Sequence, residues 1–431
     1  MGNPKSRVRT FIQRLFISLE LFGQNGLANH AAAGAYGFLL SAVPALLLVS
    51  FILLTALRSS PQAVTRLIMN IDFFRDNFED TQLIETFLSA AQPGISGIIS
   101  VLSIFWAARI FAQSIQRGLK IIFPGMKAGN FLLDNLMIFI VEVLVILAAI
   151  LLVLSSQVAR MLYNVFGSLW GSFPAFTEVS GLALSLLPVA GLGLLSYCTY
   201  RMIPALAPSR LSALKGTIAG IISFKITSFL LHLFMNEIRY NFLYGALGNL
   251  IILLGDVYFF FYFYFFGAQI AFVIDSFDAL LFSRFRRIQK QAPKFSNLID
   301  RKLFASAGGR LLRYVRAFQE GETIFTRGED SAEVYYLLSG EVGVYLYDAE
   351  EDPGAVTVLR SGAFFGETAS LLSEARTATI KALKDTAALV LPPALFAEVL
   401  ASDTNMDRAI IESLSKRLKS TNEKFRPRET V

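Results

Sequence analysis

Apolar residues are distributed unevenly along this chain of 431 residues. Long apolar runs fill the chain before residue 280, whereas apolar residues alternate with charged ones after it. A run of about 20 apolar residues is long enough for a helix to cross a bilayer. The sequence therefore predicts a membrane α-helical bundle followed by a water-soluble C-terminal region.

The bundle is predicted to contain about six membrane-spanning helices. An amphipathic helix over about residues 1–27 is expected to lie on the membrane surface before the first span. Gly216 and Gly220 have the four-residue spacing that lets two helices approach closely. The predicted spans are about 31–57, 94–116, 134–158, 179–203, 211–235 and 247–275.

The distribution of lysine and arginine predicts the orientation of the bundle. One basic group precedes the first span, one lies between spans two and three, one lies between spans four and five, and one follows span six. With six spans all four groups lie on one side, and basic loops remain in the cytoplasm. We therefore expect a multi-pass protein with both termini cytoplasmic.

Charged residues inside the predicted spans form a candidate polar site. A charged side chain at the bilayer centre costs roughly 2.5–3.5 kcal/mol on insertion scales, so such residues are expected to face each other or a wet cavity. They line a substrate path in one interpretation; in the other they are structural ion pairs or extend to the interface. These residues are Arg109, Glu142, Lys225 and Asp256.

Catalytic and metal-binding motifs are not evident in the sequence. The single cysteine, Cys198, excludes an internal disulfide and a cysteine-rich metal site. The two histidines, His30 and His232, are far apart, and for each an interfacial hydrogen bond is favoured over proton chemistry. The net charge of +6 comes from basic residues beside apolar spans, which indicates lipid headgroups rather than nucleic acid. We therefore expect neither an enzyme nor a metal site.

The C-terminal region reads as a small β-domain with flanking helices. Short strands bounded by glycine turns at Gly321, Gly328 and Gly340 predict a β-roll with a jelly-roll-like path. The expected strands are 319–325, 334–338 and 342–347, and the expected helices are 393–401 and 404–422. The resulting domains are a membrane domain over 1–283, a basic helical linker over 284–302 and a cytoplasmic domain over 303–431.

The stretch from Phe365 to Ile380 has the features of a phosphate-binding loop. Gly366 allows a tight turn, and the helical turn that follows has free N–H groups. Arg376 can hold two phosphate oxygens, and Glu367 can accept hydrogen bonds from a sugar hydroxyl. We expect Arg376 to face an otherwise empty pocket, so that its removal would leave the fold intact.

This stretch resembles the phosphate-binding cassette of cyclic nucleotide-binding domains, with its F-G-E start and R-T-A-T-I close. The resemblance implies that Glu367 binds the ribose 2′-hydroxyl and that Arg376 binds the cyclic phosphate. Cyclic AMP and cyclic GMP both remain open as the regulatory ligand. The ligand-binding residues that it implies are Gly366, Glu367, Thr368, Ser370, Arg376 and Thr377.

The membrane body resembles the YihY/BrkB family of bacterial inner-membrane proteins over roughly residues 10–282. The resemblance rests on Ala31–Tyr36 with Ser41 and Pro44, on Tyr200–Pro204, on Tyr244–Leu247 and on Gly267–Gln269. The family usually has glutamate where Gln269 stands, so a charge-dependent activity of the family is in doubt here.

Together these features predict a cyclic nucleotide-regulated inner-membrane protein that transports lipid-like or other small molecules. Three alternatives remain open: a non-transporting sensor or scaffold, a membrane enzyme, and an ion channel, although no TVGYG filter sequence is present. The expected partners are the lipid bilayer and the cyclic nucleotide, with a second copy of the chain as a further candidate and no nucleic acid.

Overall fold

A computed structural model of the protein describes residues 4–40, 95–123, 189–204, 207–237, 246–290, 302–304, 309–346 and 355–402, with residues 410, 411 and 415. The chain divides into two compact units. The helical unit is Leu15–Asp275, and the sandwich unit combines Met1–Arg14 with Ser276–Val431.

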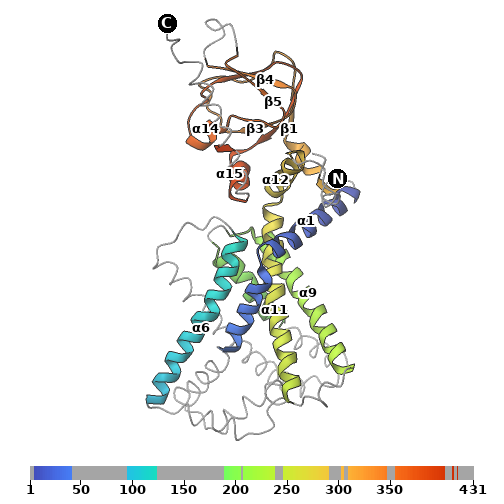
Figure 1. The fold of residues 1–431 in the computed structure, drawn as a ribbon, viewed down its shortest axis with the longest axis vertical. Coiled ribbons are helices and arrows are strands. Elements are labelled where there is room, and N and C mark those ends of the chain that lie inside the picture. The colour runs from blue at the N-terminus through green and yellow to red at the C-terminus, as the bar shows by residue number, and fades with distance from the viewer. Residues whose placement is uncertain are drawn as a thin grey trace, which may run out of the picture. The chain divides into compact units, whose positions relative to one another are not determined.

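Long helices build the helical unit. They are α6 (Ile95–Ile122), α9 (Arg210–Glu237), α11 (Ala246–Asp275), two further helical segments at 27–40 and 189–202, and the C-terminal part of α1 (Pro4–Gln24) from Leu15 onward. Helix α11 lies between α6 and α9 and contacts both (Figure 1). Within the described part of the chain, Arg210–Phe234 and Ile251–Asp275 are long and apolar enough to cross a membrane.

The helices expected at 94–116, 211–235 and 247–275 correspond to α6, α9 and α11. The expected span at 134–158, with Glu142, lies outside the described residues, as do parts of the spans at 31–57 and 179–203. The number of six spans therefore stays a prediction.

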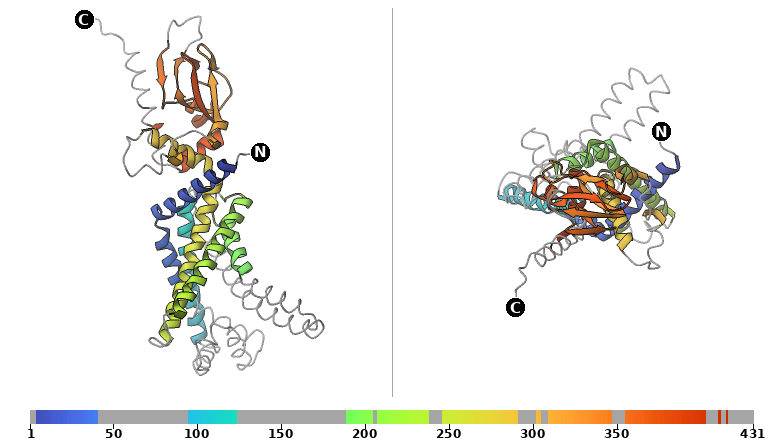
Figure 2. Two further views of the ribbon diagram at one scale, coloured as in Figure 1. Left: turned by 90° about the vertical axis from the view of Figure 1, so that its right-hand side faces the viewer. Right: turned by 90° about the horizontal axis from the view of Figure 1, so that it is seen from above.

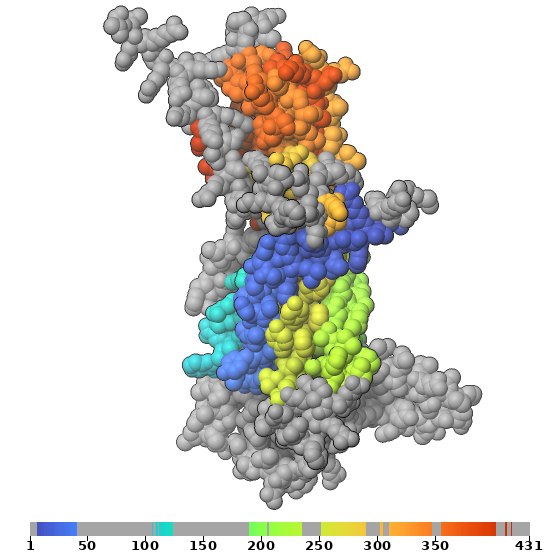
Figure 3. Space-filling model, turned by 45° about the vertical axis from the view of Figure 1, so that its right-hand side comes forward, coloured from blue at the N-terminus to red at the C-terminus, as the bar shows by residue number. Residues whose placement is uncertain are grey.

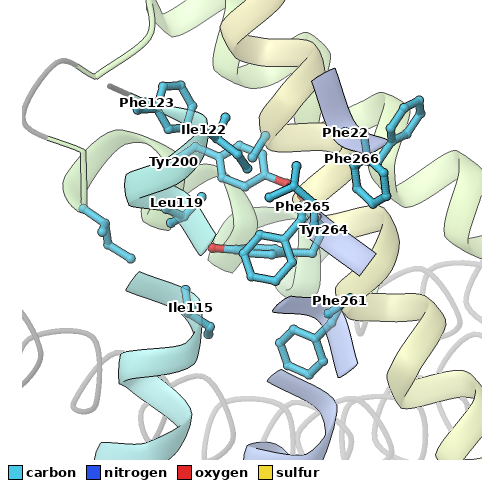
Figure 4. Packing of buried hydrophobic residues seen from close by; sticks show 14 of the residues in the cluster. Phe22, Ile115, Leu119, Ile122, Phe123, Tyr200, Phe261, Tyr264, Phe265 and Phe266 are labelled. Carbon is cyan, nitrogen blue, oxygen red and sulfur yellow. The ribbon is translucent and has the colours of Figure 1, made fainter. Parts of the chain in front are cut away.

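Aromatic side chains of α11 form the core of the helical unit. Ile115 and Leu119 of α6 point toward Tyr264 and Phe265 of α11, and all four are buried (Figure 4). A Cβ atom on Gly118 would lie 2.3 Å from the ring of Phe265. The small residue in α6 thus provides the space that this ring occupies.

Helices α9 and α11 lie side by side (Figure 3), and three glycines allow their close contact. A Cβ atom on Gly216 would lie 2.3 Å from the carbonyl oxygen of Gly267, and one on Gly220 would lie 2.7 Å from that of Phe263. Glycine spacing of this kind allows helix backbones to approach closely. The close helix approach expected from the spacing of Gly216 and Gly220 is confirmed, and Gly267 of α11 lies opposite them.

Replacement of Gly267 by alanine is expected to destabilise the helical unit. The new Cβ atom would lie 2.6 Å from the carbonyl oxygen of Gly216 and 2.9 Å from the hydroxyl of Tyr200. Overpacking of this kind typically costs about 1–3 kcal/mol, which thermal denaturation of the full-length protein in detergent would detect. Gly255→Ala, also in α11, is the control because its Cβ atom would approach the flexible end of Leu231. Equal midpoints for the two variants would contradict the prediction.

The β-domain is confirmed as a sandwich of two antiparallel four-stranded sheets that face each other (Figure 2). The first sheet has the order β1 (Val315–Phe318), β8 (Thr386–Leu391), β3 (Val334–Ser339), β6 (Phe364–Phe365). The second has the order β2 (Thr323–Phe325), β7 (Thr379–Ala382), β4 (Glu341–Tyr345), β5 (Thr357–Arg360). Gly321, Gly328 and Gly340 have positive φ angles, as the predicted turns require.

Helices flank this sandwich. They are η2 (Gly309–Tyr314), α14 (Glu367–Leu372), α15 (Pro393–Ser402) and α12 (Phe277–Lys290), which packs against α15. Helix α12 starts after a break at Ser276, ahead of the predicted linker at 284. Asp278 in its first turn accepts hydrogen bonds from Arg310 at 2.8 Å and from Tyr314 at 3.2 Å. The helix expected at 404–422 lies almost wholly outside the described residues.

Candidate functional site

Arg376 is the best-organised charged residue of the predicted cassette. It lies between α14 and β7, and only 2% of its surface is exposed. Its guanidinium donates hydrogen bonds to the Ser331 hydroxyl at 2.9 Å, the Gly366 carbonyl at 2.9 Å and the Glu333 carbonyl at 2.8 Å. The expectation that Arg376 faces an empty pocket is therefore wrong, because its side chain ties three segments of the domain together.

Gly366 allows this arrangement through its backbone. Its φ angle of 78° lies in the left-handed region, and it precedes α14 as the N-cap. A Cβ atom at this position would lie 2.6 Å from Nη1 of Arg376. Glycine is thus required both for the backbone conformation and for the space that the guanidinium occupies.

Aromatic rings and carboxylates surround the guanidinium. Its central carbon lies 4.1 Å from the ring centroid of Phe325 and 5.8 Å from that of Tyr335. Burial lowers the pKa of Arg376, while Tyr335 and nearby carboxylates, among them that of Glu367, act in the opposite direction. Burial, with the charge of Glu333, raises the pKa of Tyr335 to about 12. The site therefore combines one cation with nearby carboxylates and a neutral phenol.

Arg376 keeps donors for an anion. A guanidinium has five N–H groups, and the three hydrogen bonds use one on Nε, one on Nη1 and one on Nη2. One N–H on each terminal nitrogen is therefore left in these contacts. Two N–H donors on one guanidinium can contact two oxygens of a phosphate.

The other predicted cassette residues lie on both sides of Arg376 in the chain. Glu367 begins α14 and is 1% exposed, Thr368 and Ser370 are partly buried, and Thr377 is exposed. Sequence reasoning missed Ser331, Glu333 and Phe325. Glu333 contributes a backbone carbonyl, for which side-chain identity gives no signal.

The charged residues predicted inside the spans have separate surroundings. Arg109 is exposed on α6, Lys225 is exposed on α9 beside the ring of Phe224, and Glu142 lies outside the described residues. Asp256 of α11 instead contacts α9, through Ser228 and His232. Among the residues that the structure describes, no group of three or more His, Cys, Asp or Glu side chains is placed to hold a metal ion.

A pocket with hydroxyl and aromatic walls lies between the helix of residues 189–202, α9 and α11. The Tyr200 hydroxyl donates to the carbonyl of Tyr264, whose own hydroxyl donates to Thr199 at 2.7 Å. The hydroxyl of Thr217 is buried and has no hydrogen-bond partner among the described residues. The lining residues carry no charge; they are Ser196, Tyr200, Thr217, Gly220, Ile221, Phe224, Phe260 and Tyr264.

Two proteins of known sequence are similar to parts of the chain. Over 99 residues the chain is 36% identical to a "Putative potassium channel protein" of Rhodopseudomonas palustris, which covers 23% of this chain and 24% of that protein. Over 66 residues it is 39% identical to the cGMP-dependent protein kinase of Plasmodium berghei, which covers 15% and 7%. The chain thus spans about a quarter or less of these relatives.

Solved structures also match part of the chain. The EAL enzyme Bd1971 in its cAMP-bound form is 25% identical, with 25% of this chain and 29% of that chain covered and a TM-score of 0.21. The Catabolite Activator Protein of Thermus thermophilus is 22% identical, with 33% and 61% covered and a TM-score of 0.25.

Two family models match separate regions of the sequence. The model described as "Cyclic nucleotide-binding domain" matches residues 315–403, which include the sandwich and the cassette around Arg376. The model described as "Virulence factor BrkB" matches residues 18–283, more than half of the chain. The chain therefore belongs to the BrkB family, and it carries a cyclic nucleotide-binding domain fused to its family domain.

Proposed function

We propose that this chain is an integral protein of the bacterial inner membrane that transports lipid-like or other small molecules under the control of a cyclic nucleotide. The arrangement of Arg376 is the observation that carries the proposal. Its guanidinium is buried and fixed in place, and one N–H on each terminal nitrogen is left for an anion. A cation fixed in this way suits the cyclic phosphate, because its rotamer entropy is already lost before the ligand binds.

In this proposal different cassette residues bind different parts of the nucleotide. Arg376 binds the phosphate together with Gly366, Ser370 and Thr377, while Glu367, with Thr368 beside it, binds the ribose. The ligand is cyclic AMP or cyclic GMP, and the domain that binds it extends over residues 303–431. Residues 284–302 then link it to a membrane domain over 1–283 with both termini in the cytoplasm.

The neutral pocket between α9, α11 and residues 189–202 supports transport of a molecule without a strong charge. Hydroxyls and aromatic rings line it, and its space is about that of one water molecule, so a larger cargo requires the helices to separate here. A fixed anion or cation would find no opposite charge on these walls. The proposal therefore favours amphipathic molecules over ions.

A flux assay in liposomes tests this function. Full-length protein is reconstituted with a phospholipid that carries a fluorescent headgroup label, and transfer between leaflets is followed with and without cyclic AMP or cyclic GMP. We expect nucleotide to change the rate of transfer several-fold, because a ligand shifts a conformational equilibrium by its difference in affinity for the two states.

The other outcomes separate the competing functions. Nucleotide binding without any flux of lipid or ion would favour a sensor or scaffold over a transporter. Nucleotide-dependent release of potassium, with no lipid transfer, would favour a channel. Absence of nucleotide binding would contradict the regulatory part of the proposal.

A further inference from the structure

Helix α1 carries an exposed stripe of large apolar side chains. The members of the stripe follow one another at intervals of one, three or four residues, so they lie on one face of the helix. Each of them is between 39% and 67% exposed, and an exposed apolar face of this kind marks an interaction surface. They are Val8, Phe11, Ile12, Leu15 and Leu19.

Polar side chains of the same helix face the sandwich unit instead. Gln13 is buried and donates a hydrogen bond to the carbonyl oxygen of Leu303 at 2.7 Å. Arg9 donates to the same oxygen at 2.9 Å. The start of α1, up to Arg14, belongs to the sandwich unit, yet it buries an amide and exposes Phe11. A helix in water has the opposite pattern, so the stripe indicates an apolar surrounding.

Arginines gather at the end of this segment. The central guanidinium carbon of Arg14 lies 4.8 Å from the ring centroid of Phe277, and that of Arg310 lies 5.7 Å from the same centroid. Asp278 accepts hydrogen bonds from Arg310 at 2.8 Å and from Arg313. Burial lowers the pKa of Arg14, the charge of Arg310 adds to this, and Asp278 acts in the opposite direction. This arginine cluster, Arg14 with Arg310 and Arg313, thus places three cations around one carboxylate.

The arginine cluster is close in the chain to a candidate membrane span. Ile251–Asp275 is long and apolar enough to cross a membrane, and Phe277 comes two residues after its end. Two residues extend at most about 7 Å, so Phe277 stays near the level at which this segment leaves the bilayer. Lipid headgroups lie at that level, and an excess of positive charge there attracts anionic lipids.

Arginines also border the apolar stripe. Arg7 lies one turn before Phe11 and Arg14 lies nearly one turn after it, so both follow the same edge of the stripe. A helix in the plane of a membrane surface has this pattern, because its apolar face enters the acyl chains while guanidinium groups extend to the headgroups.

We propose that residues 4–14 and the arginine cluster form a binding surface for anionic phospholipids. The apolar stripe contacts acyl chains, and Arg310 and Arg313 bind the lipid phosphate, with the charge of Arg14 beside them. The side chains of Arg310 and Arg313 are 39% and 50% exposed, so a phosphate can reach them while Asp278 holds them in place. The surface attaches the sandwich unit to the bilayer whether or not nucleotide is bound.

The proposal rests on the proposed membrane location of the helical unit, but on neither nucleotide binding nor transport. Failure of the full-length protein to incorporate into lipid nanodiscs would contradict that location. An α1 in contact with water, in protein that has incorporated, would overturn the present proposal alone.

Spin labels on the full-length protein in nanodiscs test the apolar contact. A label at Phe11→Cys is compared with one at Leu372→Cys, an exposed apolar position of the sandwich unit, both in a Cys198→Ser background. Oxygen concentrates among acyl chains, whereas a nickel chelate stays in water. We expect the Phe11 label to collide more often with oxygen, and several-fold less often with nickel, than the Leu372 label.

Two results of this comparison would overturn the proposal. The first is an equal rate of nickel collisions at the two labels, which would place Phe11 in water. The second is a Phe11 label shielded from both reagents, which would indicate that protein, such as a second copy of the chain, covers the stripe.

Lipid composition tests the phosphate contact. Nanodiscs of phosphatidylglycerol, which is anionic, are compared with nanodiscs of phosphatidylcholine, whose choline neutralises the phosphate. Phosphatidylcholine should raise the rate of nickel collisions at the Phe11 label, because the arginines lose their anionic partner. The double variant Arg310→Gln, Arg313→Gln should make this rate the same in both lipids. Arg360→Gln, at an exposed arginine of the same domain, should keep the difference.

Asp278→Asn separates lipid binding from a purely structural ion pair. It keeps Arg310 and Arg313 and removes the carboxylate that they contact, so the difference between the two lipids should persist or increase. Loss of the difference in Asp278→Asn, as in the double variant, would mean that the arginines only fix α12. Equal rates in the two lipids for the protein with native arginines would overturn the phosphate contact even if the variants fail to fold.

Discussion

Replacement of Arg376 by lysine is expected to reduce the thermal stabilisation that cyclic AMP or cyclic GMP gives to the full-length protein to about a third or less. A ligand at 100 times its Kd stabilises the state that binds it by about 2.7 kcal/mol. Loss of one partner from a buried, hydrogen-bonded charge pair costs roughly 2–5 kcal/mol of binding free energy, which is about 30-fold or more in affinity. A lysine ammonium retains the charge but cannot present two parallel N–H groups to the phosphate.

The same substitution also lowers the stability of the protein without nucleotide. Arg376 binds the carbonyl oxygens of Gly366 and Glu333 and the hydroxyl of Ser331. A buried acceptor left without a partner costs about 1–3 kcal/mol. The quantity to measure by calorimetry is therefore the difference in Tm with and without nucleotide for each variant, rather than the Tm alone.

Arg360→Lys is the matched control for this experiment. Arg360 belongs to the same domain, but its side chain is 80% exposed and lies 3.5 Å from Glu341 at the surface. Its replacement should leave both the basal Tm and the nucleotide-induced shift almost unchanged. A shift of wild-type size in Arg376→Lys would show that Arg376 does not bind the phosphate.

The sequence predicted the local features that one residue type decides. Glycine marks turns because only glycine adopts a positive φ angle without steric cost, which is why Gly321, Gly328 and Gly340 located the turns between strands. Gly366 and Arg376 located the cassette for a similar reason. Gly366 provides the turn and the space, and Arg376 provides a planar guanidinium with several N–H donors. Their roles in nucleotide binding remain a proposal.

Contacts between distant segments were not predictable in the same way. The partners of Arg376 include two backbone carbonyls, and every residue has a carbonyl. The meeting of His232 with Asp256 depends on the rotation of α9 against α11, which the glycine seam determines. The basic residues after 283 indicated a helix, but they did not indicate that α12 begins at Phe277 or that Arg284 and Arg286 are buried. Both follow from the packing of α12 on α15 and on the rings of Tyr336 and Phe364.

Replacement of Phe282 by alanine is expected to lower the Tm of the sandwich unit strongly. Phe282 in α12 is fully buried, and its ring lies 5.4 Å from that of Tyr336 and 6.1 Å from that of Phe364. Truncation of a buried phenylalanine costs about 3–5 kcal/mol. For a domain of this size each kcal/mol corresponds to roughly 2–4 °C, so calorimetry should show a fall of roughly 6–20 °C. Leu372→Ala, at a position that is 60% exposed, should change the Tm little.

The substitution also tests whether α12 transmits nucleotide binding from the cassette to the helical unit. Phe364 lies two residues before Gly366 in the chain, and its ring contacts Phe282 and Arg286 of α12. The hydrogen bonds and ring contacts described above for Arg376 involve residues other than Phe282, so Phe282→Ala should still bind nucleotide at temperatures where the domain is folded. If α12 transmits the signal, the liposome flux of this variant should no longer respond to nucleotide, while Leu372→Ala responds normally. A full response in Phe282→Ala, with the Tm lowered, would mean that the contact stabilises the domain without transmitting its state.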